Sequence, residues 1–240
     1  MSERPDFDFE ICVNEYGVYC VPDIMRKREV CRIVLKGKVN EPRTLNFIRS
    51  IVGQGDVVSG GAFIGDFLPP ISKAMGADQT LYSFEPNPMS FQAATETIRL
   101  SDLRNVRLFP VAVGQHNTTV PLVVTSEEGR ALGGISKIID APIEGRTVDT
   151  KVMTIDDLVD DKRHVSLIHL DVETFEWEAL LGARETIRRC RPFLILEAGP
   201  EEARAKYAQN LTEVFPEIGY QLVGFMERNA FFRSGSANLV

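Results

Sequence analysis

The stretch from residue 57 to residue 87 constrains the fold of this chain more than any other part of it. Two apolar, β-like runs flank a loop with glycines at 60, 61 and 65, and the second run ends in Glu85. The order strand, glycine loop, helix, strand and acid is typical of an α/β sheet that binds a nucleotide-like ligand, because small residues let the loop approach the ligand closely. A carboxylate after the second strand can accept hydrogen bonds from both hydroxyls of a ribose. A glycine turn in any doubly wound sheet is the alternative interpretation.

The spacing of the glycines narrows the choice of ligand. A dinucleotide-binding loop has the pattern Gly-x-Gly-x-x-Gly, in which the middle glycine makes room for a pyrophosphate. Phe63 stands where that middle glycine is expected. A bulky residue there favours a ligand without a pyrophosphate, and S-adenosylmethionine, an adenosine joined to an amino-acid tail, is such a ligand. The sequence Glu85-Pro86-Asn87 after the second strand suits its ribose.

The composition indicates a single globular α/β protein. The chain has 240 residues, of which 44% are hydrophobic and 25% charged, enough for one domain with a well-buried core and a small appendage. We expect an N-terminal extension over residues 1–52 that packs on a ligand-binding domain over residues 53–240. The formal net charge of −7 disfavours nucleic acid and membranes as partners. A small-molecule substrate and a homo-oligomer are both compatible with the composition.

The N-terminus and the cysteines favour a cytoplasmic location. Residues 1–6 are polar and acidic, unlike a signal peptide, and no apolar run approaches the ~18 residues of a membrane helix. The four cysteines lack a Cys-x-x-Cys spacing, so we expect buried free thiols rather than a zinc site.

Hydrophobic periodicity predicts alternating strands and helices from residue 56 onward, after a short lead-in. Strands are expected at 9–13, 17–21, 31–34, 57–58, 80–84, 105–109, 119–124, 151–153, 165–170, 193–196, 220–225 and 230–233. Helices are expected at 41–52, 64–75, 88–101, 154–157, 175–190 and 201–214, with a kink or delay at Pro69 and Pro70. The glycine-rich loop 125–147 is either a connector or a lid, formed by Gly133-Gly134-Ile135-Ser136, over a substrate.

The predicted strand ends carry the candidate site residues. Ligands of open α/β sheets bind beyond the carboxyl ends of the strands. Small residues or carboxylates occupy these ends at 59–65, 85–87, 111–114, 171–173 and Glu197. Asp171, Glu173 and Glu197 could together bind a cation, but carboxylates without a defined spacing are weak support, and we predict no metal.

Taken in order, these segments resemble the FkbM-type family of S-adenosylmethionine-dependent methyltransferases. The resemblance covers roughly residues 40–235 and rests on the motifs Gly61-Ala62-Phe63-Ile64-Gly65-Asp66, Phe84-Glu85-Pro86-Asn87, Val111-Ala112-Val113-Gly114, Thr154-Ile155-Asp156-Asp157-Leu158 and Ile168-His169-Leu170-Asp171-Val172-Glu173. It implies a Rossmann-like sheet of seven strands with the last strand antiparallel, and methyl transfer, usually to a hydroxyl.

The resemblance also implies roles for individual residues. The methionine tail would lie along Gly61, Ala62, Phe63 and Gly65, and the ribose against Glu85, Pro86 and Asn87. Val111 and Ala112 would touch the adenine, and Asp171 would lie near the transferred methyl group.

Four positions depart from the family pattern. Ser59 replaces an acid, Phe63 an asparagine, His169 a lysine and Thr174 a small residue. We expect Ser59 to belong to the cofactor site, with one contact to the ligand's ammonium weakened.

The candidate catalytic residues are Asp171, His169 and Glu173. A sulfonium donor is already activated, so the enzyme must position it and, for a hydroxyl acceptor, remove a proton. His169 is the best base by its ordinary pKa near 6.5, and a core histidine bonded to a carbonyl is the alternative. Asp171 could be a base or a donor clamp, and Glu173 a substrate ligand or a helix cap. Ser136, Glu173 and Glu197 are predicted to bind the acceptor.

The predicted function is methyl transfer from S-adenosylmethionine, with O-methylation of a small metabolite or sugar favoured. A nicotinamide-dependent oxidoreductase is a second hypothesis, which Phe63 opposes. A non-catalytic methyltransferase-like binding module is a third, which Ser59 favours and the carboxylates at 171, 173 and 197 oppose.

Overall fold

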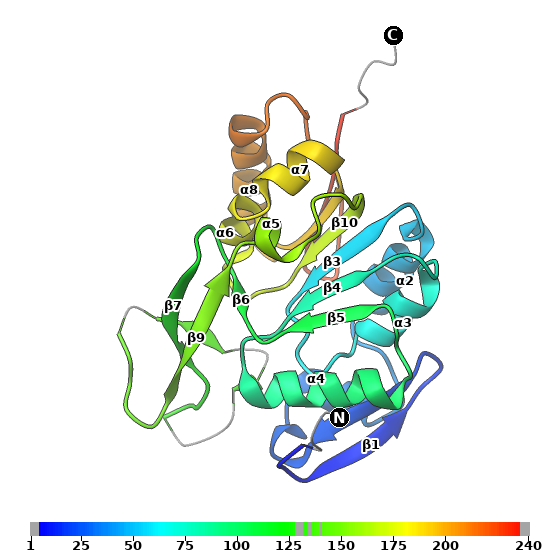
Figure 1. Cartoon of the computed structure of the whole chain (residues 1–240), viewed down its shortest axis with the longest axis vertical. Helices are drawn as coiled ribbons and strands as arrows, with labels where there is room; N and C mark the ends of the chain where they lie inside the picture. The colour runs from blue at the N-terminus through cyan, green and yellow to red at the C-terminus, as the bar shows by residue number, and fades with distance from the viewer. Residues whose placement is uncertain (1–4, 128–131, 134–135, 140, 236–240) are drawn as a thin grey trace.

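A computed structural model describes residues 5–127, 132–133, 136–139 and 141–235 (Figure 1). Gly134 and Ile135, two residues of the expected lid, lie outside this description. No helix among the described residues is long and apolar enough to cross a membrane.

The core of the molecule is a seven-stranded sheet in the order β12-β13-β11-β10-β3-β4-β5. Its strands are β3 (Asp56–Gly60), β4 (Leu81–Phe84), β5 (Val106–Phe109), β10 (Val165–Leu170), β11 (Phe193–Glu197), β12 (Gln221–Met226) and β13 (Asn229–Arg233). The strands β5, β4, β3, β10 and β11 are mutually parallel, and β13 is antiparallel to β11. The predicted seven-stranded sheet with an antiparallel last strand is therefore confirmed.

Alternating residues of the strands divide the core into two layers. Val57, Leu81, Leu167 and Ile195 face α2 (Pro42–Ile51) and α3 (Leu68–Ala74). Their neighbours Val58, Tyr82, Ile168 and Leu194 face α5 (Ile155–Leu158), α6 (Glu176–Leu181), α7 (Arg184–Cys190) and α8 (Glu201–Val214). Strands buried on both faces are expected for a parallel sheet covered by helices.

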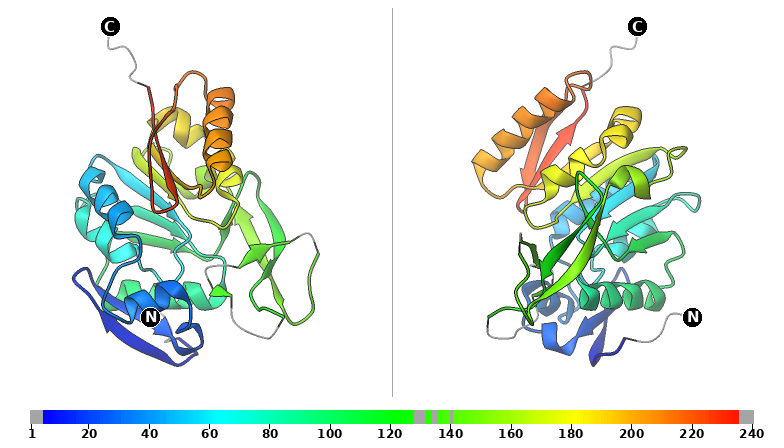
Figure 2. Two further views of the ribbon diagram at one scale, coloured as in Figure 1. Left: turned by 180° about the vertical axis from the view of Figure 1, so that it is seen from behind. Right: turned by 60° about the vertical axis from the view of Figure 1, so that its left-hand side comes forward.

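The N-terminal part of the chain, residues 7–35, packs on α4 (Pro88–Leu100), which lies between it and the sheet. It contains the hairpin β1 (Phe9–Val13) and β2 (Val18–Pro22), the short helix η1 (Asp23–Met25) and α1 (Glu29–Val34). The backbone N–H groups of Val18 and Cys20 donate to Ser101 Oγ (2.9 Å) and Thr97 Oγ1 (3.0 Å) at the end of α4. The hairpin and α8 consequently lie at opposite ends of the molecule (Figure 2).

A second, smaller sheet of four strands stands beside the main one. Its order is β6-β9-β7-β8, from β6 (Ala112–Val113), β7 (Thr118–Val123), β8 (Lys137–Ile138) and β9 (Thr147–Met153). Ile138 on β8 pairs with Leu122 on β7, and the nearby Ser136 contacts the side chain of Asn87, which follows β4.

Three sequence predictions are wrong in detail. Residues 31–34 are helical, because Cys31 and Val34 both point into the core of the N-terminal extension while Arg32 is exposed. The helix at 64–75 starts only at Leu68, after the glycine loop. The helix at 175–190 is split into α6 and α7 at Gly182, where a Cβ atom would lie 2.0 Å from the carbonyl oxygen of Gly114.

Candidate functional site

The glycine loop after β3 passes tightly against the end of β10. Gly61 has a φ of +84°, and a Cβ atom there would lie 1.8 Å from the carbonyl oxygen of Asp171. Only glycine allows both this backbone conformation and this approach. The loop thereby joins two strand ends that the sequence places 110 residues apart, as Gly61 and Asp171.

Glu85 fixes the second side of the glycine loop. Its carboxylate accepts hydrogen bonds from the backbone N–H groups of Phe63 (2.7 Å) and Asn87 (2.8 Å), and the residue is 4% exposed. Burial raises the pKa of Glu85 to about 8, although the two N–H donors act in the opposite direction. Each carboxylate oxygen has a lone pair left for a ligand hydroxyl.

Asn87 anchors α4 and holds Ser136. Its side-chain oxygen accepts from the N–H groups of Met89 (3.0 Å) and Ser90 (3.2 Å), as an N-cap does. Its side-chain nitrogen donates to Ser136 Oγ (2.9 Å), and that hydroxyl donates to the carbonyl oxygen of Gly133 (2.7 Å). The structure therefore ties Ser136 to the predicted cofactor residues, and its predicted contact with the acceptor stays a prediction.

Two adjoining cavities share Gly61, Glu85, Asp171 and Glu173. The first, of about 240 Å³, is also lined by Ser59, Ala62, Phe63, Asp66, Phe67 and His169, and by Arg28, Glu29 and Asn40 of the N-terminal extension. The second, of about 50 Å³, is also lined by Phe84, Pro86, Val111, Ala112, Val113 and Ser136. The walls of the second cavity are mostly apolar, whereas the first is rich in carboxylates.

His169 lies in the first cavity and faces Ser59 on the neighbouring strand. The two residues are in register on β10 and β3, and His169 Nδ1 lies 3.1 Å from Ser59 Oγ. Phe67 stacks on the imidazole at 5.4 Å, and Nε2 is buried with no hydrogen-bond partner among the described residues. Burial lowers the pKa of His169 to about 4, so the ring is neutral near pH 7 and a weak base.

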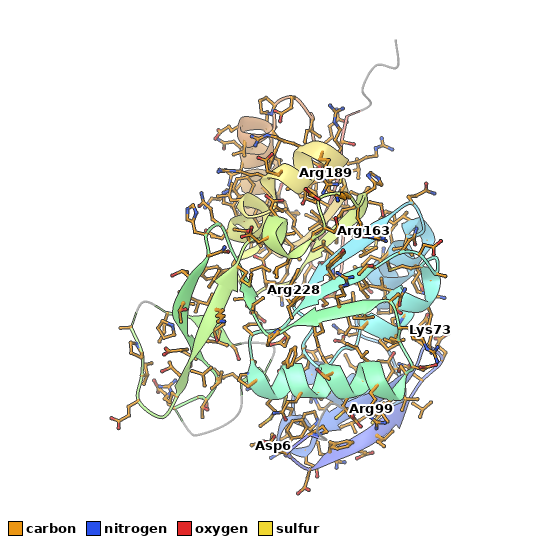
Figure 3. The ribbon with its side chains drawn as sticks, in the orientation of Figure 1. Asp6, Lys73, Arg99, Arg163, Arg189 and Arg228 are labelled. Atoms are coloured by element: carbon orange, nitrogen blue, oxygen red, sulfur yellow. The ribbon has the colours of Figure 1, made fainter. Side chains whose placement is uncertain are left out.

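A group of carboxylates surrounds Asp171 on its other side. Asp171, Glu176 and Glu197 each place an oxygen within 4.8 Å of the others, and burial together with Glu197 raises the pKa of Asp171. Glu176 accepts from the N–H of Val172 (2.9 Å) and from the hydroxyl of Tyr207 (3.1 Å). Arg228 forms an ion pair with Glu197 at 2.7 Å, at the strand-end edge of the sheet (Figure 3). These bonds give Glu176 and Glu197 partners without a cation, and the absence of a metal stays a prediction.

Glu197 is set apart from the other predicted site residues. It lines a third cavity, of about 340 Å³, together with Glu176, Tyr207 and Arg228. Asp171 lines the first two cavities, so the two carboxylates stand on opposite sides of one wall. Of the remaining predicted site residues, Gly65 packs against Thr97 and Asn87 caps α4, and neither lines the cavities.

The comparison with protein families identifies the chain. The model of the methyltransferase FkbM domain matches residues 59–222. The chain belongs to the FkbM methyltransferase family. No curated protein sequence matches it.

Solved structures share the fold at low sequence identity. Methyltransferase FkbM from Methylobacillus flagellatus KT has a TM-score of 0.54 and 18% identity, over 75% of this chain and 43% of that protein. Trm5b from Pyrococcus abyssi has a TM-score of 0.55 and 10% identity, over 96% of this chain and 57% of that protein. This chain thus spans about half the length of these two proteins.

One departure from the FkbM pattern coincides with a strained turn. Glu173 and Thr174, directly after β10, have φ values of +55° and +81°. A β-branched residue seldom adopts this conformation, and a small residue adopts it more readily. The turn nevertheless places Glu173 in the lining of the first two cavities.

Several residues of this FkbM domain site were missed by the sequence analysis. Asp66 follows the glycine loop directly, a position that could have marked it, and burial raises its pKa to about 7. Glu176 lies in the first turn of the helix after the 171–173 motif, where helix capping is an ordinary explanation. Arg28, Glu29 and Asn40 give no local signal, since only the packing of the N-terminal extension brings them to the cavity.

Proposed function

We propose that this chain is an S-adenosylmethionine-dependent methyltransferase that transfers a methyl group to a hydroxyl of a small, uncharged metabolite or sugar. The supporting observation is the pair of adjoining cavities that meet at Gly61, Glu85 and Asp171. One has the apolar walls that suit an adenine, and the other has the room and the polarity for an amino-acid tail and an acceptor.

The residues present fit this cofactor. The carboxylate of Glu85 is buried between the two cavities and retains acceptor capacity for the two ribose hydroxyls. Val111 and Ala112 would flank the adenine, and the glycine loop would line the tail. His169 Nε2, which is buried without a partner in the described part of the chain, could hydrogen-bond the tail or the acceptor.

When bound, S-adenosylmethionine supplies a methyl group on a cationic sulfur. The chain has to hold the donor and the acceptor in line and to accept the proton of the hydroxyl. Asp171 is the preferred base, because burial lowers the basicity of His169 and raises that of Asp171. Asp66, Glu85, Asp171 and Glu173 in one cavity favour a cationic donor and disfavour anionic acceptors.

The negative charge of the chain and the carboxylates of the first cavity indicate the kind of acceptor. An acidic chain with an acidic cavity suits an uncharged small-molecule acceptor better than nucleic acid or a membrane surface. We propose a cytoplasmic enzyme on the grounds given by the sequence.

Binding of S-adenosylhomocysteine tests the proposed function. At 100 times its Kd the ligand should stabilise the fold by ~2.7 kcal/mol, seen as a higher Tm. Glu85→Ala should lose this shift, whereas Glu202→Ala, at an exposed position on α8, should keep it. NAD should give no shift. Stabilisation by NAD in place of S-adenosylhomocysteine would support the oxidoreductase, and no stabilisation by either would refute the cofactor assignment.

A further inference from the structure

Methyl transfer to a hydroxyl releases the proton of that hydroxyl, and a group in the site has to accept it. The bond from sulfur to the methyl carbon breaks, the bond from the acceptor oxygen to that carbon forms, and the hydroxyl proton leaves the oxygen. The sulfur loses its positive charge in the same step. The cavity must therefore take up one proton while one positive charge disappears from it.

Asp171 and Glu197 are arranged to hold such a proton. An oxygen of each carboxyl group lies within 4.8 Å of an oxygen of the other. Two ionised carboxylates this close repel each other, so the pair favours holding one proton. They come from the ends of the adjacent parallel strands β10 and β11, which fixes their separation.

The two carboxyl groups open on different sides. Asp171 lines the first two cavities, and His169 lines the first of them, where its Nε2 has no hydrogen-bond partner among residues that the structure describes. Glu197 lines the third cavity, where its side chain is 22% exposed and that of its partner Arg228 is 72% exposed. A proton on the pair can therefore come from the first two cavities through Asp171 and leave to solvent through Glu197.

We propose that Asp171 and Glu197 act as one proton-holding pair, in which Asp171 takes the proton of the acceptor hydroxyl and Glu197 releases it to solvent through the third cavity. The proposal rests on the proposed function. Before transfer the pair carries two negative charges beside one positive sulfur, and afterwards one negative charge beside a neutral sulfur. The net charge of the site is the same in both states, so the step leaves no uncompensated charge in a buried cavity.

The other charges around the pair agree with this role. Glu41 before α2, Glu173 in the turn after β10 and Glu176 on α6 all face Asp171 or Glu197 and favour retention of a proton. Arg228, from the turn between β12 and β13, opposes it from the solvent side. Glu173 lies on the side of the first two cavities and Arg228 on the side of the third, which favours uptake at Asp171 and release at Glu197.

Proton counting by calorimetry tests the pair without knowledge of the acceptor. Isothermal titrations of the full chain with S-adenosylmethionine and with S-adenosylhomocysteine are run at pH 6.5 in two buffers of different ionisation enthalpy. We expect close to one more proton to be released by S-adenosylmethionine than by S-adenosylhomocysteine, because only the former brings a cationic sulfur to Asp171. Any proton lost from Glu85 cancels, since both ligands carry the same ribose.

Variants assign the proton to the pair. Glu197→Gln should abolish the difference between the two ligands while both still bind, and Glu202→Gln should retain it. Arg228→Gln should move the proton release to higher pH, and it provides the test if Glu197→Gln fails to fold. Equal proton release by both ligands in the unmodified chain, or an unchanged difference in Glu197→Gln, would refute the pair alone. Failure of both ligands to bind would refute the proposed function and the pair with it.

Discussion

The change in the free energy of unfolding caused by Glu85→Gln should be negative at low pH and positive at high pH. The carboxylate is buried at the junction of the two ligand cavities and accepts from the N–H groups of Phe63 and Asn87. Glutamine has nearly the same shape and never carries a charge. Its NH₂ group cannot accept, so one of the two N–H donors loses its partner.

The pKa of Glu85 sets the size of its contribution to the pH dependence of stability. It rises from 4.5 to about 8 on folding, so the folded state binds the proton more tightly than the unfolded state. The associated stability is fully present below pH 4.5 and is lost as the pH rises toward 8. The loss is about 1.4 kcal/mol for each pH unit in this window, or about 5 kcal/mol in total.

Glutamine has no such pH dependence but carries a constant cost. An unpaired buried N–H costs about 1–3 kcal/mol. The variant should therefore be less stable than the wild type below about pH 5, and more stable by about 2–4 kcal/mol at pH 9, with the curves crossing between about pH 5 and pH 7.

Urea unfolding from pH 4.5 to pH 9 measures this difference. Asp66, Glu41 and Asp171 also have raised pKa values and contribute to the pH dependence of both proteins, so only the difference between them reports on Glu85. Glu202→Gln serves as a control for a charge removed from the surface. A difference that stays constant over this range would refute the reasoning that an ionised Glu85 is costly in the free protein.

Two further substitutions test the local geometry of the site. Thr174→Gly should raise the free energy of unfolding by about 1 kcal/mol in urea titrations, since glycine relieves the strain of a φ of +81°; a loss of stability would show that the Thr174 side chain stabilises the turn. Asn87→Ala should lower the free energy of unfolding by about 1–2 kcal/mol by removing the cap of α4, and weaken S-adenosylhomocysteine binding in calorimetry because Ser136 is released; unchanged affinity would place Ser136 outside the donor site.

The layers of the sheet could be predicted from the sequence because their signal is local. Apolar runs such as 165–170 and 193–196 mark strands buried on both faces, and the intervening helical periods mark crossovers. Chain order then places the strand ends at one edge of the sheet, which is why Glu85, Asp171 and the glycine loop were all expected there and are found there.

The errors arise where distant segments decide the local structure. Residues 31–34 have β-like composition, but the hairpin β1–β2 offers a surface that residues three apart on a helix can cover. The break between α6 and α7 exists because Gly182 approaches Gly114, and because Asp156 accepts hydrogen bonds from the N–H groups of Glu185 (3.0 Å) and Thr186 (2.8 Å). No window of sequence around residue 182 contains these partners.

Two of the departures from the family pattern, Ser59 and His169, contact each other. In that pattern residue 59 is an acid and residue 169 a lysine, and the two positions are in register on neighbouring strands. Here a hydroxyl faces a neutral imidazole at 3.1 Å, so the two positions carry a neutral contact where an acid and a lysine would form an ion pair. Replacing both partners of a buried pair leaves no unpaired charge, whereas changing one alone is costly. Asp66, Asp171 and Glu173 line the same cavity, so carboxyl groups that can ionise beside the cationic donor that we propose are still present although residue 59 is not an acid.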